Sequence, residues 1–214
     1  MHRVFTAFAL FTVLLLARPA WTEDNIFKHP QVTVSVYNDA HVPAAIVSRA
    51  EERAASIFTS ANFEVAWVTC TQASNENPPA CLQVDEPGHL ALRVISDAAT
   101  VSDIAFGIAF LSPSGDGRYC DVFWKRAEEL QSVSNSDLAG ILGSVMAHEI
   151  GHLLLGSNAH AVSGIMRARW EGEELHRIAM GTLLFTPQQA KRMRGRVRLS
   201  ESAQRSAQQK SPSS

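Results

Sequence analysis

Residues 138–152, LAGILGSVMAHEIGH, decide how the rest of the chain is arranged. Ser134, followed by Asp137 three residues later, resembles a capping box that starts a helix here. Apolar residues then recur at helical spacing and share one face with two histidines: Leu138, Ile141, Leu142, Val145, His148 and His152. We therefore expect both histidines to face inward from a helix that other elements cover.

Alternating segments upstream of this helix predict strands. One face of each should be buried, because apolar and polar residues alternate and β-branched types are frequent. The strand candidates are Gln31 to Tyr37, Phe63 to Thr69, His89 to Ile95, Phe106 to Leu111 and Tyr119 to Trp124. A helix is predicted from Pro43 to about Ser60, and a loop from Thr71 to Pro87.

The C-terminal third is less regular. After Gly156 the patterning lapses until Thr186 and Pro187, which predict a final helix to about Val197. The fold class that follows is α+β or α/β. We expect one domain with a mixed five-stranded sheet backed by helices, including the histidine helix and the C-terminal helix.

Composition sets wide bounds on function. The chain has 214 residues, of which 46% are apolar and 19% charged, and this composition excludes a disordered or fibrous protein. A formal net charge of -2 gives no overall electrostatic reason to expect nucleic acid or an acidic membrane surface as partner.

The N-terminus resembles a secretory signal peptide. His2 and Arg3 precede an uncharged apolar run from Val4 to Ala17, which falls short of the ~20 residues that a spanning helix needs. We predict a signal peptide at 1–20, with an uncleaved anchor as the alternative, and a secreted or periplasmic location without a stable membrane span. The domain would cover 21–199, and the polar tail 200–214 is predicted to be disordered.

Export permits disulfides. Cys70 and Cys81 flank a polar loop that contains prolines, and we predict that they pair. Cys120 would then be a free, half-buried thiol on a strand, although pairing of Cys120 with either of the others stays open.

The chemistry is concentrated in the segment His148-Glu149-Ile150-Gly151-His152. Residues four apart on a helix lie about 6 Å apart on one face, so two imidazoles can reach one cation with Glu149 beside them. Imidazole suits zinc, and two histidines leave the site short of ligands. The sequence therefore predicts a site for one Zn²⁺ with a third ligand from elsewhere.

The run His148 to Met166, HEIGHLLLGSNAHAVSGIM, resembles the active-site segment of metzincin metallopeptidases. The resemblance implies that Gly156 is the helix-ending turn, His160 the third metal ligand and Met166 the methionine turn. Gly151 and the spacing from His160 to Met166 are similar to the matrixin branch in particular.

The chain departs from the family pattern in two places. Three residues, where the family has two, separate His152 from Gly156 and Gly156 from His160, which gives HExxHxxxGxxxH. This lengthening leaves alternatives to His160 as the ligand, namely His176, Glu171, Glu173 or Glu174.

Over residues 31–198 the resemblance implies a metzincin-like domain and a secreted zinc metallopeptidase, with an endopeptidase favoured. Glu149 would be the general base, and Phe106 to Ser112 the edge strand that pairs with a peptide or protein substrate. We expect a monomer and no nucleic-acid partner. A zinc-stabilised binding module and a hydrolase of a non-peptide amide or ester are the alternatives, and Glu149 favours catalysis over the first. Neither tyrosine follows Met166, so the oxyanion stabiliser is unassigned.

Overall fold

The computed structural model describes residues 29–71, 77–97 and 105–210. The predicted signal peptide at 1–20 lies outside the described residues. Within these residues, five strands, five α-helices and one short 3-10 helix follow one another in this order: β1 (Gln31–Asn38), α1 (Ala44–Ser60), β2 (Glu64–Cys70), η2 (Pro79–Leu82), β3 (His89–Ile95), β4 (Gly107–Phe110), β5 (Tyr119–Phe123), α2 (Trp124–Ser132), α3 (Leu138–Leu155), α4 (Gly172–Ala179) and α5 (Pro187–Lys210).

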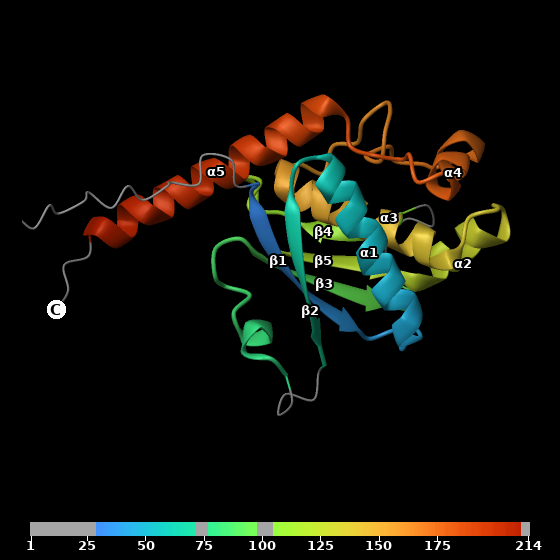
Figure 1. Ribbon diagram of the computed structural model, residues 1–214, viewed down its shortest axis with the longest axis horizontal. Coiled ribbons are helices and arrows are strands. Elements are labelled where there is room, and N and C mark those ends of the chain that lie inside the picture. Colours follow the sequence, from blue (N-terminus) through green and yellow to red (C-terminus); the bar gives the residue numbers. More distant parts are fainter. Residues whose placement is uncertain (1–28, 72–76, 98–104, 211–214) are drawn as a thin grey trace, which may run out of the picture.

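The strands form one mixed sheet in the order β2-β1-β3-β5-β4 (Figure 1). All neighbours are parallel except β4, which runs antiparallel to β5 and forms one edge of the sheet. The predicted single domain with a mixed five-stranded sheet backed by helices is confirmed. Among the described residues β4 pairs with β5 alone, so its other side can offer backbone groups to a further strand.

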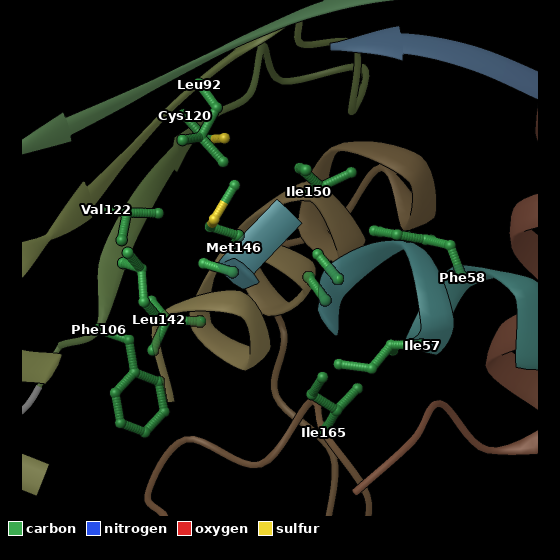
Figure 2. Packing of buried hydrophobic residues seen from close by; sticks show 14 of the residues in the cluster. Ile57, Phe58, Leu92, Phe106, Cys120, Val122, Leu142, Met146, Ile150 and Ile165 are labelled. Atoms are coloured by element: carbon green, nitrogen blue, oxygen red, sulfur yellow. The ribbon is translucent and has the colours of Figure 1, made fainter. Parts of the chain in front are cut away.

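Helix α3 is the centre of the core. Figure 2 shows Leu92, Cys120 and Val122 of the sheet directed toward Leu142 and Met146 on one side of α3, while α1 covers another side. Sixteen of the 18 residues of α3 are buried, so the helix is surrounded, whereas the sequence pattern indicated one buried face. Helix α3 is long and apolar enough to cross a membrane, but 89% of this 18-residue stretch is buried inside the protein.

The loop after β2 is fastened to the sheet by a disulfide. Cys70 at the end of β2 is bonded to Cys81 in η2, with the two Cα atoms 5.9 Å apart. The Tyr37 hydroxyl also donates a hydrogen bond of 3.1 Å to the Cys81 carbonyl. Cys120 is a free thiol and is fully buried on β5, not half-buried.

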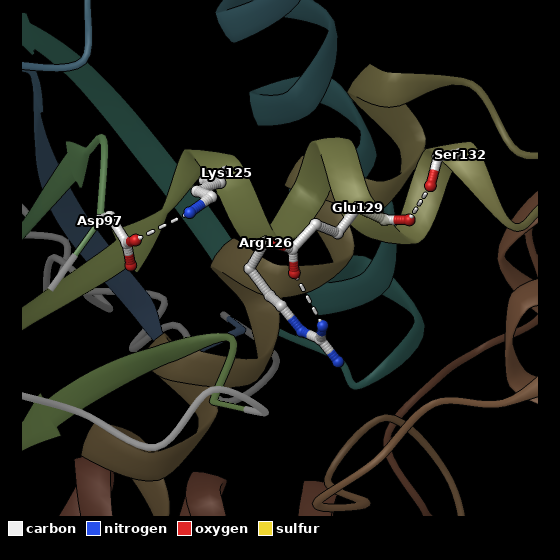
Figure 3. Close-up of polar contacts among 5 residues, drawn as sticks. All are labelled: Asp97, Lys125, Arg126, Glu129 and Ser132. Carbon is white, nitrogen blue, oxygen red and sulfur yellow. Dashed lines mark hydrogen bonds and ion pairs between the residues drawn. The ribbon is translucent and has the colours of Figure 1, made fainter. Parts of the chain in front are cut away.

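Helix α2 was missed by the sequence analysis. It follows β5 without a loop, buries only Ala127 and Leu130, and is otherwise polar, so its apolar pattern is too weak to detect. Local contacts on its surface support it, as Figure 3 shows: Lys125 lies 3.5 Å from Asp97, and Arg126 lies 2.9 Å from Glu129 one turn on. The Ser132 hydroxyl donates to the Glu129 carbonyl at 2.7 Å.

Two differences concern the C-terminal third. Helix α4 occupies part of the segment that the sequence left irregular, and a reciprocal capping box between Glu171 and Glu174 starts it. Helix α5 begins as predicted, with Thr186 and Gln189 capping each other, but it continues to Lys210 and not only to Val197. Residues 200–210, assigned to the disordered tail, are thus helical. They contain Ala, Gln, Glu and Ser but no Gly or Pro, which is compatible with helix.

Candidate metal centre

The ends of α3 fix the positions of His148 and His152. Asp137 is the N-cap, and its carboxylate accepts a hydrogen bond of 2.9 Å from the Gly140 amide, a role that the sequence analysis had divided between Ser134 and Asp137. At the other end Gly156 adopts a left-handed conformation, with φ of 62°, and closes the helix. The turn at Gly156 then directs the chain back over the last turn of α3.

Both imidazoles are oriented by backbone carbonyls. His148 Nδ1 donates to the Ile165 carbonyl at 2.7 Å, and His152 Nδ1 donates to the Ser157 carbonyl at 2.8 Å. Because a carbonyl only accepts, each Nδ1 carries the hydrogen and each Nε2 of a neutral ring presents a lone pair. Burial, followed by the neighbouring His152, lowers the pKa of His148 to about 3, so its ring is neutral near pH 7.

The two Nε2 atoms lie 3.1 Å apart. Two lone pairs this close repel each other unless a cation lies between them, and neutral imidazole is the form that binds metal. Nitrogens bound tetrahedrally to one zinc at about 2.0–2.1 Å lie about 3.3 Å apart. The pair therefore fits a shared zinc ion.

His160 completes the donor set. Its ring centroid is 5.4 Å from that of His148 and 5.0 Å from that of His152, and one ligand atom from each of the three residues lies within 4.8 Å of the others. The structure thus brings His160 to the pair although both gaps in the motif are one residue longer than in the family pattern. Three imidazoles are a donor set that suits zinc, and the site fits one zinc ion.

Among the described residues, none of the alternative ligands that the sequence left open lies in the cluster of the three histidines. Glu171 is occupied as the N-cap of α4. Glu174 is held by the Arg167 guanidinium at 2.5 Å and by the backbone amide of Glu171. Neither Glu173 nor His176 belongs to the cluster of ligand atoms.

Glu149 faces the same cavity as the three histidines. The cavity has a volume of about 450 Å³, and residues 105–109 at the edge strand, together with Asn158 and Ala168, form the rest of its lining. Burial raises the pKa of Glu149 to about 8. Among the described residues its carboxylate has no hydrogen-bond partner, so it is free to act on a molecule in the cavity.

Met166 lies beneath the histidine helix. A β-carbon added at Gly151 would be 2.8 Å from the Met166 sulfur, which shows how closely the turn approaches α3. The Met166 carbonyl accepts from the Ala161 amide at 2.8 Å, and the Ile165 amide donates to the Leu184 carbonyl at 3.0 Å. These bonds hold the turn in place and leave the Ile165 carbonyl beside His148.

Sequence reasoning missed two residues at this centre. Gly107 provides room for Glu149, because a β-carbon there would be 2.8 Å from the Glu149 Cγ. Trp170 is buried beside His148, and its indole donates to the Ile165 carbonyl. Neither residue is marked in the sequence by a motif, since both roles depend on contacts with distant segments.

Comparison with solved structures shows the same fold in a zinc-dependent peptidase. A zinc-dependent peptidase from Methanocorpusculum labreanum is similar with a TM-score of 0.52 and 13% identity, over 75% of this chain and 99% of that one. An archaemetzincin from Methanopyrus kandleri has a TM-score of 0.49 and 16% identity, over 81% of this chain and 98% of that one. No family model and no curated protein matches the sequence.

Proposed function

We propose that this chain is an exported zinc metallopeptidase that cleaves peptide bonds within a polypeptide, with Glu149 as the general base. The observation that carries the proposal is the convergence of three imidazoles and one carboxyl group on a single cavity beside an edge strand; this carboxyl group has no hydrogen-bond partner in the described part of the chain. The zinc-peptidase fold of the structural neighbours supports it. A matrixin-like relationship is part of the proposal and is supported by the spacing from His160 to Met166.

His148, His152 and His160 would hold the zinc ion. When bound, zinc supplies Lewis-acid polarisation of a carbonyl group and lowers the pKa of water in the cleft. Glu149 then takes a proton from the attacking water and delivers it to the leaving nitrogen. Its buried position favours this role, because burial raises the pKa of the carboxyl group toward the working pH.

The edge strand β4 supports a peptide as substrate. The side of β4 that pairs with no strand of the described residues can bind an extended chain through backbone hydrogen bonds, which would place a peptide bond over the cavity regardless of side-chain sequence. This mode of binding suits an internal segment of a polypeptide better than a free amino acid or a small ester. The predicted edge, Phe106 to Ser112, contains β4.

Export is supported by the predicted signal peptide at residues 1–20 and by the disulfide between Cys70 and Cys81. Disulfides persist in oxidising compartments such as the periplasm and the extracellular space.

The test uses the purified chain and a peptide library, with zinc content measured in parallel. Glu149→Gln should keep one zinc per chain and lose cleavage by about 10²–10⁴-fold. Glu52→Gln on the exposed face of α1 is the matched control and should retain both properties. Full cleavage by Glu149→Gln, or no cleavage by the zinc-loaded wild-type chain, would contradict the proposal.

A further inference from the structure

The Ile165 carbonyl oxygen is shared by two donors. His148 Nδ1 donates to it at 2.7 Å, and Trp170 Nε1 donates to it at 3.2 Å. A carbonyl oxygen has two lone pairs and can accept both hydrogen bonds. The indole of Trp170 and the imidazole of His148 are therefore connected through one backbone atom, although the residues are far apart in sequence.

The same indole also encloses the His148 ring. The Trp170 centroid is 5.7 Å from that of His148 with the ring planes at 82°, and Phe106 approaches the same imidazole at 5.3 Å and 84°. Trp170 and Phe106 lie against each other, with centroids 4.2 Å apart. Two aromatic rings thus restrict the orientation of the imidazole. Pairs of aromatic rings stabilise a protein by more than the burial of their apolar surface alone.

His152 lacks such an enclosure among the described residues. Its ring contacts are His148 and His160, and its carbonyl partner, Ser157, follows the turn at Gly156. Of the three histidines, and within the part of the chain that the structure describes, only His148 is fixed both by a shared carbonyl and by the rings of Trp170 and Phe106. The orientation of one metal-binding nitrogen therefore depends on a tryptophan outside the motif.

We propose that Trp170 is a positioning residue of the metal centre: its indole N–H fixes the Ile165 carbonyl, and its ring, with Phe106, holds His148 so that Nε2 points at the metal. This inference rests on the proposed zinc site. Groups that orient a ligating histidine from outside the ligand set raise metal affinity, and their loss typically weakens it about 10–100-fold. Trp170 acts through His148 and has no contact with a substrate in this role.

Trp170→Phe removes the indole N–H and keeps a smaller aromatic ring, so it removes the hydrogen bond and part of the ring contact with His148. Zinc affinity of the full chain, measured by competition with a chromophoric chelator, should fall about tenfold. The absorption bands of the Co²⁺-loaded chain should shift, because the ligand field changes when His148 turns. Trp67→Phe is the matched control, since Trp67 lies on the opposite edge strand, β2, and its indole nitrogen has no partner among the described residues. Its zinc affinity and Co²⁺ spectrum should equal those of the wild type.

A second measurement uses the wild-type chain, so it does not depend on whether a variant at position 170 folds. In the wild-type chain the indole N–H resonance of Trp170 should shift when zinc is added, while that of Trp67 stays, with assignments of the four tryptophans from Trp21→Phe, Trp67→Phe and Trp124→Phe. An unshifted Trp170 resonance, or wild-type zinc affinity and Co²⁺ spectrum in Trp170→Phe, would overturn this inference alone. A wild-type chain that binds no zinc would overturn the proposed function as well.

Discussion

Gly107 at the start of β4 lies against Glu149 of α3, so closely that a β-carbon at position 107 would come within 2.9 Å of the Glu149 carboxyl carbon. The same β-carbon would also approach the Asp121 carbonyl oxygen of the neighbouring strand. The absence of a side chain at 107 thus lets the edge strand and the proposed general base share the wall of one cavity.

Gly107→Ala should therefore displace Glu149 or β4 and reduce peptide cleavage. A misplacement of about 1 Å can cost about 10²-fold in rate, and we expect a loss of kcat/KM of that order. Zinc content should stay at one per chain, because the histidines lie on other segments. Gly172→Ala, whose β-carbon meets nothing within 4 Å, is the control and should cleave like the wild type. Wild-type kcat/KM in Gly107→Ala would show that the contact is unimportant.

The N-cap of the histidine helix gives a second prediction. Asp137→Ala removes the carboxylate that accepts from the Gly140 amide, and should lower the free energy of unfolding by about 1 kcal/mol. Asp137 also pairs with Arg49 on the exposed surface, so Arg49→Ala serves as the control and should cost about 0–1 kcal/mol, as exposed ion pairs do. Urea unfolding of both variants measures the difference. If Asp137→Ala and Arg49→Ala lowered the free energy of unfolding equally, the loss would come from the ion pair and not from the N-cap.

A third prediction concerns Gly156, which ends α3 with φ of 62°. Gly156→Ala should lower the free energy of unfolding by about 1–2 kcal/mol, because an L-residue with a side chain is strained in the left-handed region. Gly195→Ala is the opposite control: it lies within α5, a β-carbon there meets nothing, and it should raise stability by about 0.5–1 kcal/mol. Thermal unfolding shows whether each variant is more or less stable than the wild type. Stabilisation by Gly156→Ala would contradict the left-handed turn at this position.

A fourth prediction is a pH dependence that originates in Glu51 of α1. Burial raises the pKa of this carboxyl group from its ordinary value of 4.5 to about 7, and one of its oxygens is buried without a partner among the described residues. Between these values the folded chain binds more protons than the unfolded chain, so this group's contribution to stability falls as the pH rises from 4.5 to 7.

Glu51→Gln should abolish that contribution. At pH 8 the variant should be more stable than the wild type, and this advantage should have shrunk by pH 5, where the folded wild type is protonated at this position. Chemical denaturation at the two pH values measures the change. A stability difference that is the same at pH 5 and pH 8 would show that Glu51 is ionised in the folded protein throughout this range.

The parts that could be predicted from the sequence are those encoded in local spacing. His148, Glu149 and His152 lie within five residues of one helix, and the strands were recognised from alternating, β-branched residues, although β3 and β5 bury residues on both faces. Trp170 and Gly107 could not be predicted, since their roles arise only when the segments that carry them pack against α3. Helix α2 and the end of α5 were missed because local polar contacts and helix propensity support them, and neither leaves a strong apolar pattern.

X-ray absorption at the zinc edge of the purified, zinc-loaded chain tests the central claim most directly. We predict three imidazole nitrogens at about 2.0–2.1 Å from one zinc ion. His160→Ala should reduce this number to two, while His176→Ala should leave three. A wild-type spectrum with two imidazoles and a protein carboxylate, or an unchanged count in His160→Ala, would contradict the account.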